Sequence, residues 1–174
     1  MSSALNKGNL VGGSWISRFL DEIGDSTGNV DMVGNYSSNP LDFKYTVPEG
    51  KLLYVYSLTV TIEDNGSLDA GSYGNGIALT NGLKFGILTR SGEIVSATIQ
   101  KPITTNASWA TYAHDLVVHD FGSGNNTLTI RYLFERDGIP IKVASGQSLA
   151  VQLNDNFSGL RGHLCKFGGI LVPR

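Results

Sequence analysis

From residue 41 onward, apolar and polar residues alternate, which is the pattern of strands with one buried face. Phe43, Tyr45 and Val47 alternate with polar neighbours before a Pro48-Glu49-Gly50 turn. The longest alternation spans 52–62, and we predict one shared face for Leu52, Tyr54, Tyr56, Leu58, Val60 and Ile62. Further strands are predicted over 83–87, 94–99, 109–118, 128–134, 141–143, 149–153 and 160–171.

These segments are short, are separated by turn residues and show no alternation of strand with helix. That organisation predicts an all-β fold of eight or nine strands over residues 41–174, either a β-sandwich or a barrel, and an antiparallel β-sandwich is favoured. Among sandwiches, an eight-stranded jelly roll suits this number of strands best.

Residues 1–40 have a different pattern and are predicted to form an N-terminal arm. Ser14 is a suitable cap for a short helix over 15–23, and Gly24 would end it. Its apolar residues have the spacing of one helical face: Trp15, Ile16, Phe19, Leu20 and Ile23. Two interpretations remain open, a helix packed on its own domain and an arm that docks on a neighbouring subunit through these five residues.

Composition narrows the classes of function. Charged residues make up only 16% of the 174 residues, the net charge is −2, and no segment concentrates Lys or Arg. We therefore expect no nucleic acid partner. The single cysteine, Cys165, excludes an intramolecular disulfide and a cysteine-based metal cluster. No apolar run suits a signal peptide or a membrane span, so we expect synthesis in a reducing cytoplasm and no membrane partner.

The acid-rich segment 63–76 is the most distinctive loop. Asp64 and Asp69 supply oxygen atoms of the kind that Ca²⁺ prefers, but no glutamate closes the loop as in an EF-hand. Asp, Asn and Gly are also ordinary turn formers, so a hydrogen-bonded loop is favoured and neither metal nor cofactor is expected. Tyr73, Trp109 and Phe157 lie close to loops and are candidates for an exposed ligand surface. We predict Asp64, Asp69, Tyr73 and Phe157 as a contact region.

No cluster of residues indicates catalysis. His114 and His119 are five residues apart, so on a strand they point to opposite faces and cannot share a metal. His163 and Cys165 share a face, but side chains two residues apart diverge, and a buried structural cysteine is favoured. The chain is therefore predicted not to be an enzyme.

Three segments together resemble the β-sandwich virion proteins of tailed bacteriophages. The first runs from Val47-Pro48-Glu49-Gly50-Lys51 through the strand ending at Ile62-Glu63-Asp64 and on to the glycine-rich stretch 73–82. The second is Pro102-Ile103-Thr104-Thr105-Asn106-Ala107, and the third spans 149–160. The resemblance covers about residues 30–170, rests on turn and strand signatures and carries over no functional residues.

The resemblance implies a structural component of the virion, assembled in the cytoplasm of the host bacterium. A capsid decoration (cement) protein is expected, with the major capsid protein or other virion proteins as partners. Self-association is expected as well, as a trimer, since closed symmetry is the rule for such assemblies. The alternative is a receptor- or glycan-binding module of a fibre or tail, which would use the loop over 63–76 and the region around Phe157 as its contact surface.

Overall fold

The computed structural model describes residues 12–20, 33–64, 79–81, 83–89, 91–95, 115–120, 126–134 and 140–174. Within these ranges the chain forms ten strands in two antiparallel sheets and contains no helix. The predicted all-β antiparallel class is therefore confirmed for the described part of the chain.

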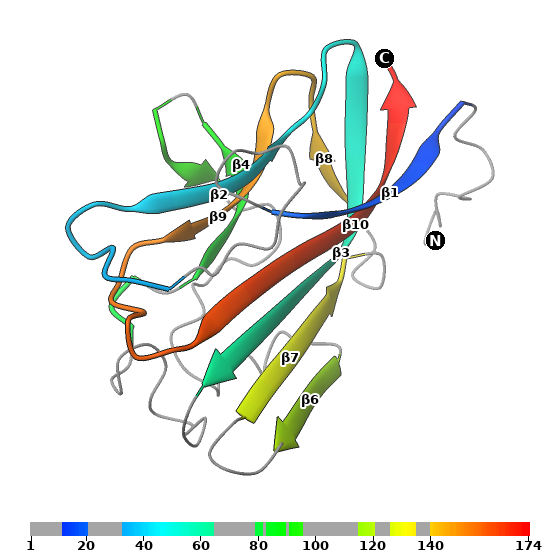
Figure 1. The fold of residues 1–174 in the computed structure, drawn as a ribbon. Helices are drawn as coiled ribbons and strands as arrows, with labels where there is room; N and C mark the ends of the chain where they lie inside the picture. Colours follow the sequence, from blue (N-terminus) through cyan, green and yellow to red (C-terminus); the bar gives the residue numbers. More distant parts are fainter. Residues whose placement is uncertain are drawn as a thin grey trace, which may run out of the picture.

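The larger sheet, called sheet A, has the strand order β1-β10-β3-β7-β6, and β8 also pairs with β3. Figure 1 shows this sheet running from β1 through the long strands β10 and β3 to β7 and β6. Its strands are β1 Ser14–Phe19, β3 Lys51–Asp64, β6 Asp115–Asp120, β7 Asn126–Leu133, β8 Ile141–Val143 and β10 Gly162–Pro173.

The smaller sheet, sheet B, has the order β2-β9-β4-β5. Its strands are β2 Leu41–Thr46, β4 Lys84–Leu88, β5 Ile94–Val95 and β9 Ser148–Leu153. Strand β9 is central, with Phe43 of β2 and Phe85 of β4 both aligned with Val151. This register puts the apolar residues of all three strands on one face, as their alternation predicts.

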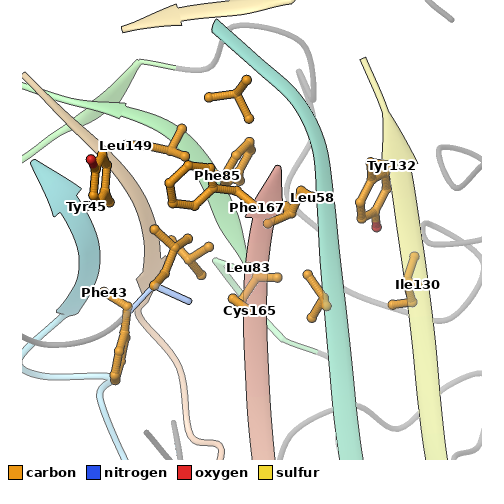
Figure 2. Close-up of a cluster of buried hydrophobic side chains, with 14 of the residues drawn as sticks. Phe43, Tyr45, Leu58, Leu83, Phe85, Ile130, Tyr132, Leu149, Cys165 and Phe167 are labelled. Carbon is orange, nitrogen blue, oxygen red and sulfur yellow. The ribbon is translucent and has the colours of Figure 1, made fainter. Parts of the chain in front are cut away.

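A single large hydrophobic cluster joins the inner faces of the two sheets. Figure 2 shows Phe85 and Leu149 of sheet B beside Phe167 and Leu58 of sheet A. The ring of Phe85 stacks on that of Phe134, with 5.7 Å between centroids. Since burial of apolar area is the main driving force of folding, this cluster holds the sheets together.

Strand β3 changes faces midway, and the prediction of one shared face from Leu52 to Ile62 is wrong for its first half. Ser57 pairs with Gly168, but the next residue of β10, Gly169, pairs with Val55, so Tyr56 is an extra residue. Such a β-bulge shifts the alternation by one position. Leu58, Val60 and Ile62 enter the main core, as do Leu53 and Val55, whereas Leu52, Tyr54 and Tyr56 belong to a separate cluster.

The predicted helix over 15–23 is also wrong where the structure describes it. Ser14–Phe19 is strand β1, aligned antiparallel with β10 from Leu171 to Lys166. The apolar spacing of Trp15, Ile16, Phe19 and Leu20 suits a helix, but the paired edge of β10 offers this segment backbone hydrogen bonds that override local preference. Leu20 continues the contact, since its N–H donates to the carbonyl oxygen of Cys165 at 2.9 Å.

Candidate functional site

The five residues of the predicted docking face do not share a face. Ile16 packs against the main core and Leu20 is 1% exposed within it. Trp15 is 58% exposed and Phe19 is half-buried, on the opposite side of the strand. Ile23 lies outside the described residues. Only Trp15 and Phe19 are therefore placed on the outer face of sheet A.

Trp15 adjoins a second hydrophobic cluster, which we call the outer cluster: Tyr56, Ile170 and Val172, with Leu52 and Tyr54 packed against them. The register aligns Trp15 with Ile170, and Ile170 with Tyr54, across three neighbouring strands. The Trp15 ring lies 5.6 Å from that of Tyr56, tilted by 43°. The bulge at Tyr56 creates this patch, because it turns three large side chains of β3 away from the main core.

An open concavity of about 240 Å³ lies beside the outer cluster, and we call it the Gly168 concavity. It is lined by residues of β1, β3, β7 and β10: Ser17, Ser57, Thr59, Arg131, Leu133, Lys166, Phe167 and Gly168. Ser17, Gly168 and Ser57 occupy one cross-strand row, and Lys166, Thr59 and Arg131 occupy the next. The missing side chain at Gly168 hollows the first row.

The two cations of the concavity differ in their partners. Arg131 forms an ion pair with Asp115 of β6, in which Nε donates to Asp115 Oδ2 at 2.7 Å and Nη2 donates to the same oxygen. The Lys166 ammonium lies 5.5 Å from the centroid of the Phe19 ring. Lys166 has no ion pair with a carboxylate of the described residues. The concavity thus carries one cation whose charge is not neutralised by a neighbour in this part of the chain.

Of the four residues in the predicted contact region, the structure describes the side chain of Phe157 alone. Phe157 is fully buried, contrary to its prediction as a ligand-contact residue, and its ring lies 6.4 Å from that of Tyr36. Its ring also meets that of His163 edge to face, with 5.1 Å between the two centroids. Asp64 ends β3, but its side chain is not described, and Asp69, Tyr73 and Trp109 lie outside the described ranges.

The loop beside Phe157 stabilises the fold through hydrogen bonds. The buried carboxylate of Asp155 accepts hydrogen bonds from the backbone N–H groups of Thr80 and Asn81, at 3.1 and 2.9 Å. Asn81 Nδ2 donates in turn to the carbonyl oxygen of Asn154 at 2.8 Å. These charge-assisted bonds fix the chain just before β4.

Cys165 is buried in the main core, as predicted, and burial raises the pKa of its thiol to about 12. A thiolate is required for nucleophilic attack, so this environment opposes reactivity. His163 is also buried, at 2% exposure. His114 lies outside the described residues, whereas His119 is on the exposed face of β6. No three His, Cys, Asp or Glu residues in the described ranges cluster as a metal site.

Sequence reasoning missed the Gly168 concavity and the outer cluster. Two consecutive glycines inside a strand pattern were the available signal, because glycine there marks a bulge or a close backbone approach. No helix among the described residues has the length and apolar character needed to cross a membrane. Comparisons with known protein families, with curated proteins and with solved structures gave no match.

Proposed function

We propose that this protein is a structural component of a tailed-bacteriophage virion, a capsid decoration protein that docks on the particle surface as a homo-oligomer. The observation that supports docking is the exposed Trp15 beside the outer cluster. The virion assignment itself is supported by the resemblance of segments 47–64, 73–82, 102–107 and 149–160.

The outer cluster has the composition of an interface core. Tryptophan and tyrosine are enriched at the centres of protein interfaces, where they contribute most of the binding free energy. Trp15 brings a large apolar surface that this fold leaves 58% exposed, and its ring is paired with that of Tyr56. Covering Trp15 with a partner surface would remove that apolar area from water.

The edge of sheet A offers a second means of docking. Within the described part of the chain, β1 pairs with β10 on one side and with no strand on the other. An unpaired edge presents N–H and C=O groups that a strand of another chain can engage. A head-to-tail contact that combines this edge with Trp15 would close a ring when repeated by symmetry. We propose a trimer because it is the smallest ring that such a contact can close.

We further propose that the two sheets form a jelly-roll sandwich, with β1 as an added edge strand. The support is the connectivity: β2 to β3, β3 to β4, β8 to β9 and β9 to β10 each pass from one sheet to the other. Repeated passage between two facing antiparallel sheets is the feature of double Greek-key sandwiches. This arrangement would leave the outer face of sheet A available for contacts.

Particle incorporation tests the proposal. Bacteria that produce the phage would express either the wild-type chain or Trp15→Ser. Particles would be purified from their lysates, and the chain bound to the particles would be quantified by immunoblot. We expect wild-type chain on the particles and severalfold less of the variant. Val95→Ser, which alters a residue 56% exposed on sheet B, is the matched control and should incorporate normally. Absence of the wild-type chain from particles would overturn the assignment, and normal incorporation of Trp15→Ser would overturn the docking surface.

A second candidate function is saccharide binding by a fibre or tail module. The Gly168 concavity favours it, because hydroxyl groups and cations surround an open hollow on a sheet face. Its proposed location differs from the contact region expected from the sequence, since Phe157 is buried.

A further inference from the structure

We propose that the Gly168 concavity binds a saccharide unit that carries a carboxylate, such as a uronate residue of an acidic polysaccharide. The inference rests on the second candidate function, saccharide binding, and adds the chemical class of the sugar and the residues that recognise it. It does not depend on the proposal of a capsid decoration protein.

The hollow itself is built into the strand register. Gly168 lies between Ser17 of β1 and Ser57 of β3, and both serines line the concavity. A Cβ atom on Gly168 would lie 2.8 Å from Ser57 Oγ, so a larger residue would displace the Ser57 hydroxyl and fill part of this row. Because Gly168 has no side chain, the space between the two serines stays open.

The next row supplies the charge. Asp115 neutralises Arg131, whereas Lys166 faces no described carboxylate. A ligand carboxylate beside Lys166 would complete the missing ion pair with a charge-assisted hydrogen bond. A guanidinium has five N–H donors, and Asp115 takes those of Nε and Nη2, so Arg131 keeps donors for a second oxygen.

The remaining lining fits a sugar better than a bare anion. The hydroxyl groups of Ser17, Ser57 and Thr59 can each donate and accept, as ring hydroxyls require. Leu133 adds an apolar wall for the C–H surface of a ring. The volume, about 240 Å³, lies below the range of about 300–1,000 Å³ typical of sites for drug-sized ligands. A single sugar unit of a chain is therefore the appropriate occupant.

Affinity for one unit is expected to be weak, because the concavity lies on an open sheet face and desolvates its ligand only in part. Repeated units of a polysaccharide would compensate when several copies of the protein bind the same polymer. Binding should also weaken as salt is raised, since Lys166 is solvent-exposed.

The test is a titration of the ¹⁵N-labelled full chain followed by NMR, with sodium glucuronate, glucose and sodium acetate as separate probes. We expect glucuronate to shift the amide signals of Ser57, Thr59 and Gly168 and to bind more tightly than either glucose or acetate. Lys166→Gln should weaken glucuronate binding about tenfold, the loss of one charge-assisted contact. Lys142→Gln removes an exposed cation from the same sheet outside the concavity and should leave binding unchanged.

The outcomes separate the inference from the function on which it rests. Equal binding of glucose and glucuronate at these amides would overturn the acidic class while supporting saccharide binding. Equal binding of acetate and glucuronate would overturn recognition of a sugar. If none of the three probes shifts these signals, both the inference and the second candidate function fail. Unchanged affinity in Lys166→Gln would overturn the role of that lysine.

Discussion

Gly169 of β10 approaches the backbone of Tyr54 so closely that an added Cβ atom would lie 2.6 Å from the Tyr54 carbonyl oxygen. This contact occurs where β10 passes the bulge at Tyr56 and the pairing shifts by one residue. A backbone oxygen cannot move aside as a flexible side chain can. The absence of a side chain at Gly169 therefore permits the bulge and, through it, the outer cluster.

We predict that Gly169→Ala destabilises the protein by about 1–3 kcal/mol, the usual cost of overpacking a well-packed site. Gly168→Ala is the matched control, because its Cβ would meet only the hydroxyl of Ser57, at 2.8 Å, and that side chain can rotate. Urea unfolding monitored by circular dichroism gives both free energies of unfolding. Equal losses in the two variants would contradict the role given to Gly169.

Phe157 is predicted to act through stability rather than ligand contact. It is 0% exposed and packs against Tyr36 and His163. Phe157→Ala should cost about 3–5 kcal/mol of unfolding free energy, as large-to-small changes of buried aromatic residues do. Chemical denaturation measures the loss, with Val95→Ala as an exposed control near zero. A change below about 1 kcal/mol in Phe157→Ala would show that this side chain is not part of the core.

Leu20 and Trp15 are predicted to separate stability from association, because they lie on opposite sides of the same segment. Leu20→Ala removes a core side chain that is 1% exposed and should cost about 2–5 kcal/mol. Trp15→Ser should change the unfolding free energy far less and lower the mass of the assembly. Urea unfolding and light scattering provide the two readouts. A destabilisation as large in Trp15→Ser as in Leu20→Ala would argue against an interface role.

The alternation of apolar and polar residues predicted the buried face correctly in strands without a bulge, where each face stays on the same side of the sheet along the whole strand. Phe43 and Tyr45 in β2, and Leu149, Val151 and Leu153 in β9, join the main hydrophobic cluster as their period of two predicts, although Ala150 and Gln152 of β9 are buried too. In β3 the same period continues through Tyr56 in the sequence, although the structure reverses the faces there. An inserted residue leaves no mark when the residues on both sides of it are apolar, so this bulge was not predictable from β3 alone.

The helix prediction for the N-terminal segment was wrong for a different reason. Trp15, Ile16, Phe19 and Leu20 satisfy a helical spacing, yet the strand that pairs with them lies at Lys166–Leu171, at the other end of the chain. The spacing of apolar residues within one segment does not indicate which distant strand that segment will pair with. The Gly168 concavity likewise combines residues of four strands, so its lysine and arginine appeared in the sequence as single scattered cations.

Cys165 is predicted to be unreactive in the native protein and to limit stability at alkaline pH. Its burial raises the pKa from an ordinary 9.0 to about 12, so the folded state holds the thiol proton more tightly than the unfolded state does. Unfolding then releases this proton between pH 9 and 12, and stability falls as pH rises through that window. Well below pH 9 the contribution is constant, because the thiol is then protonated in both states.

Two measurements check this prediction. A thiol reagent at pH 8 should modify Cys165 only after denaturant is added. Between pH 9 and 10, below the ordinary pKa of tyrosine, the unfolding free energy should decline with a slope approaching about 1.4 kcal/mol per pH unit. Cys165→Ala should be less stable at neutral pH and show a shallower decline in this interval, since it lacks the titrating group. Rapid modification of the native thiol at pH 8, or an unchanged slope in the variant, would show that Cys165 is neither shielded nor linked to unfolding.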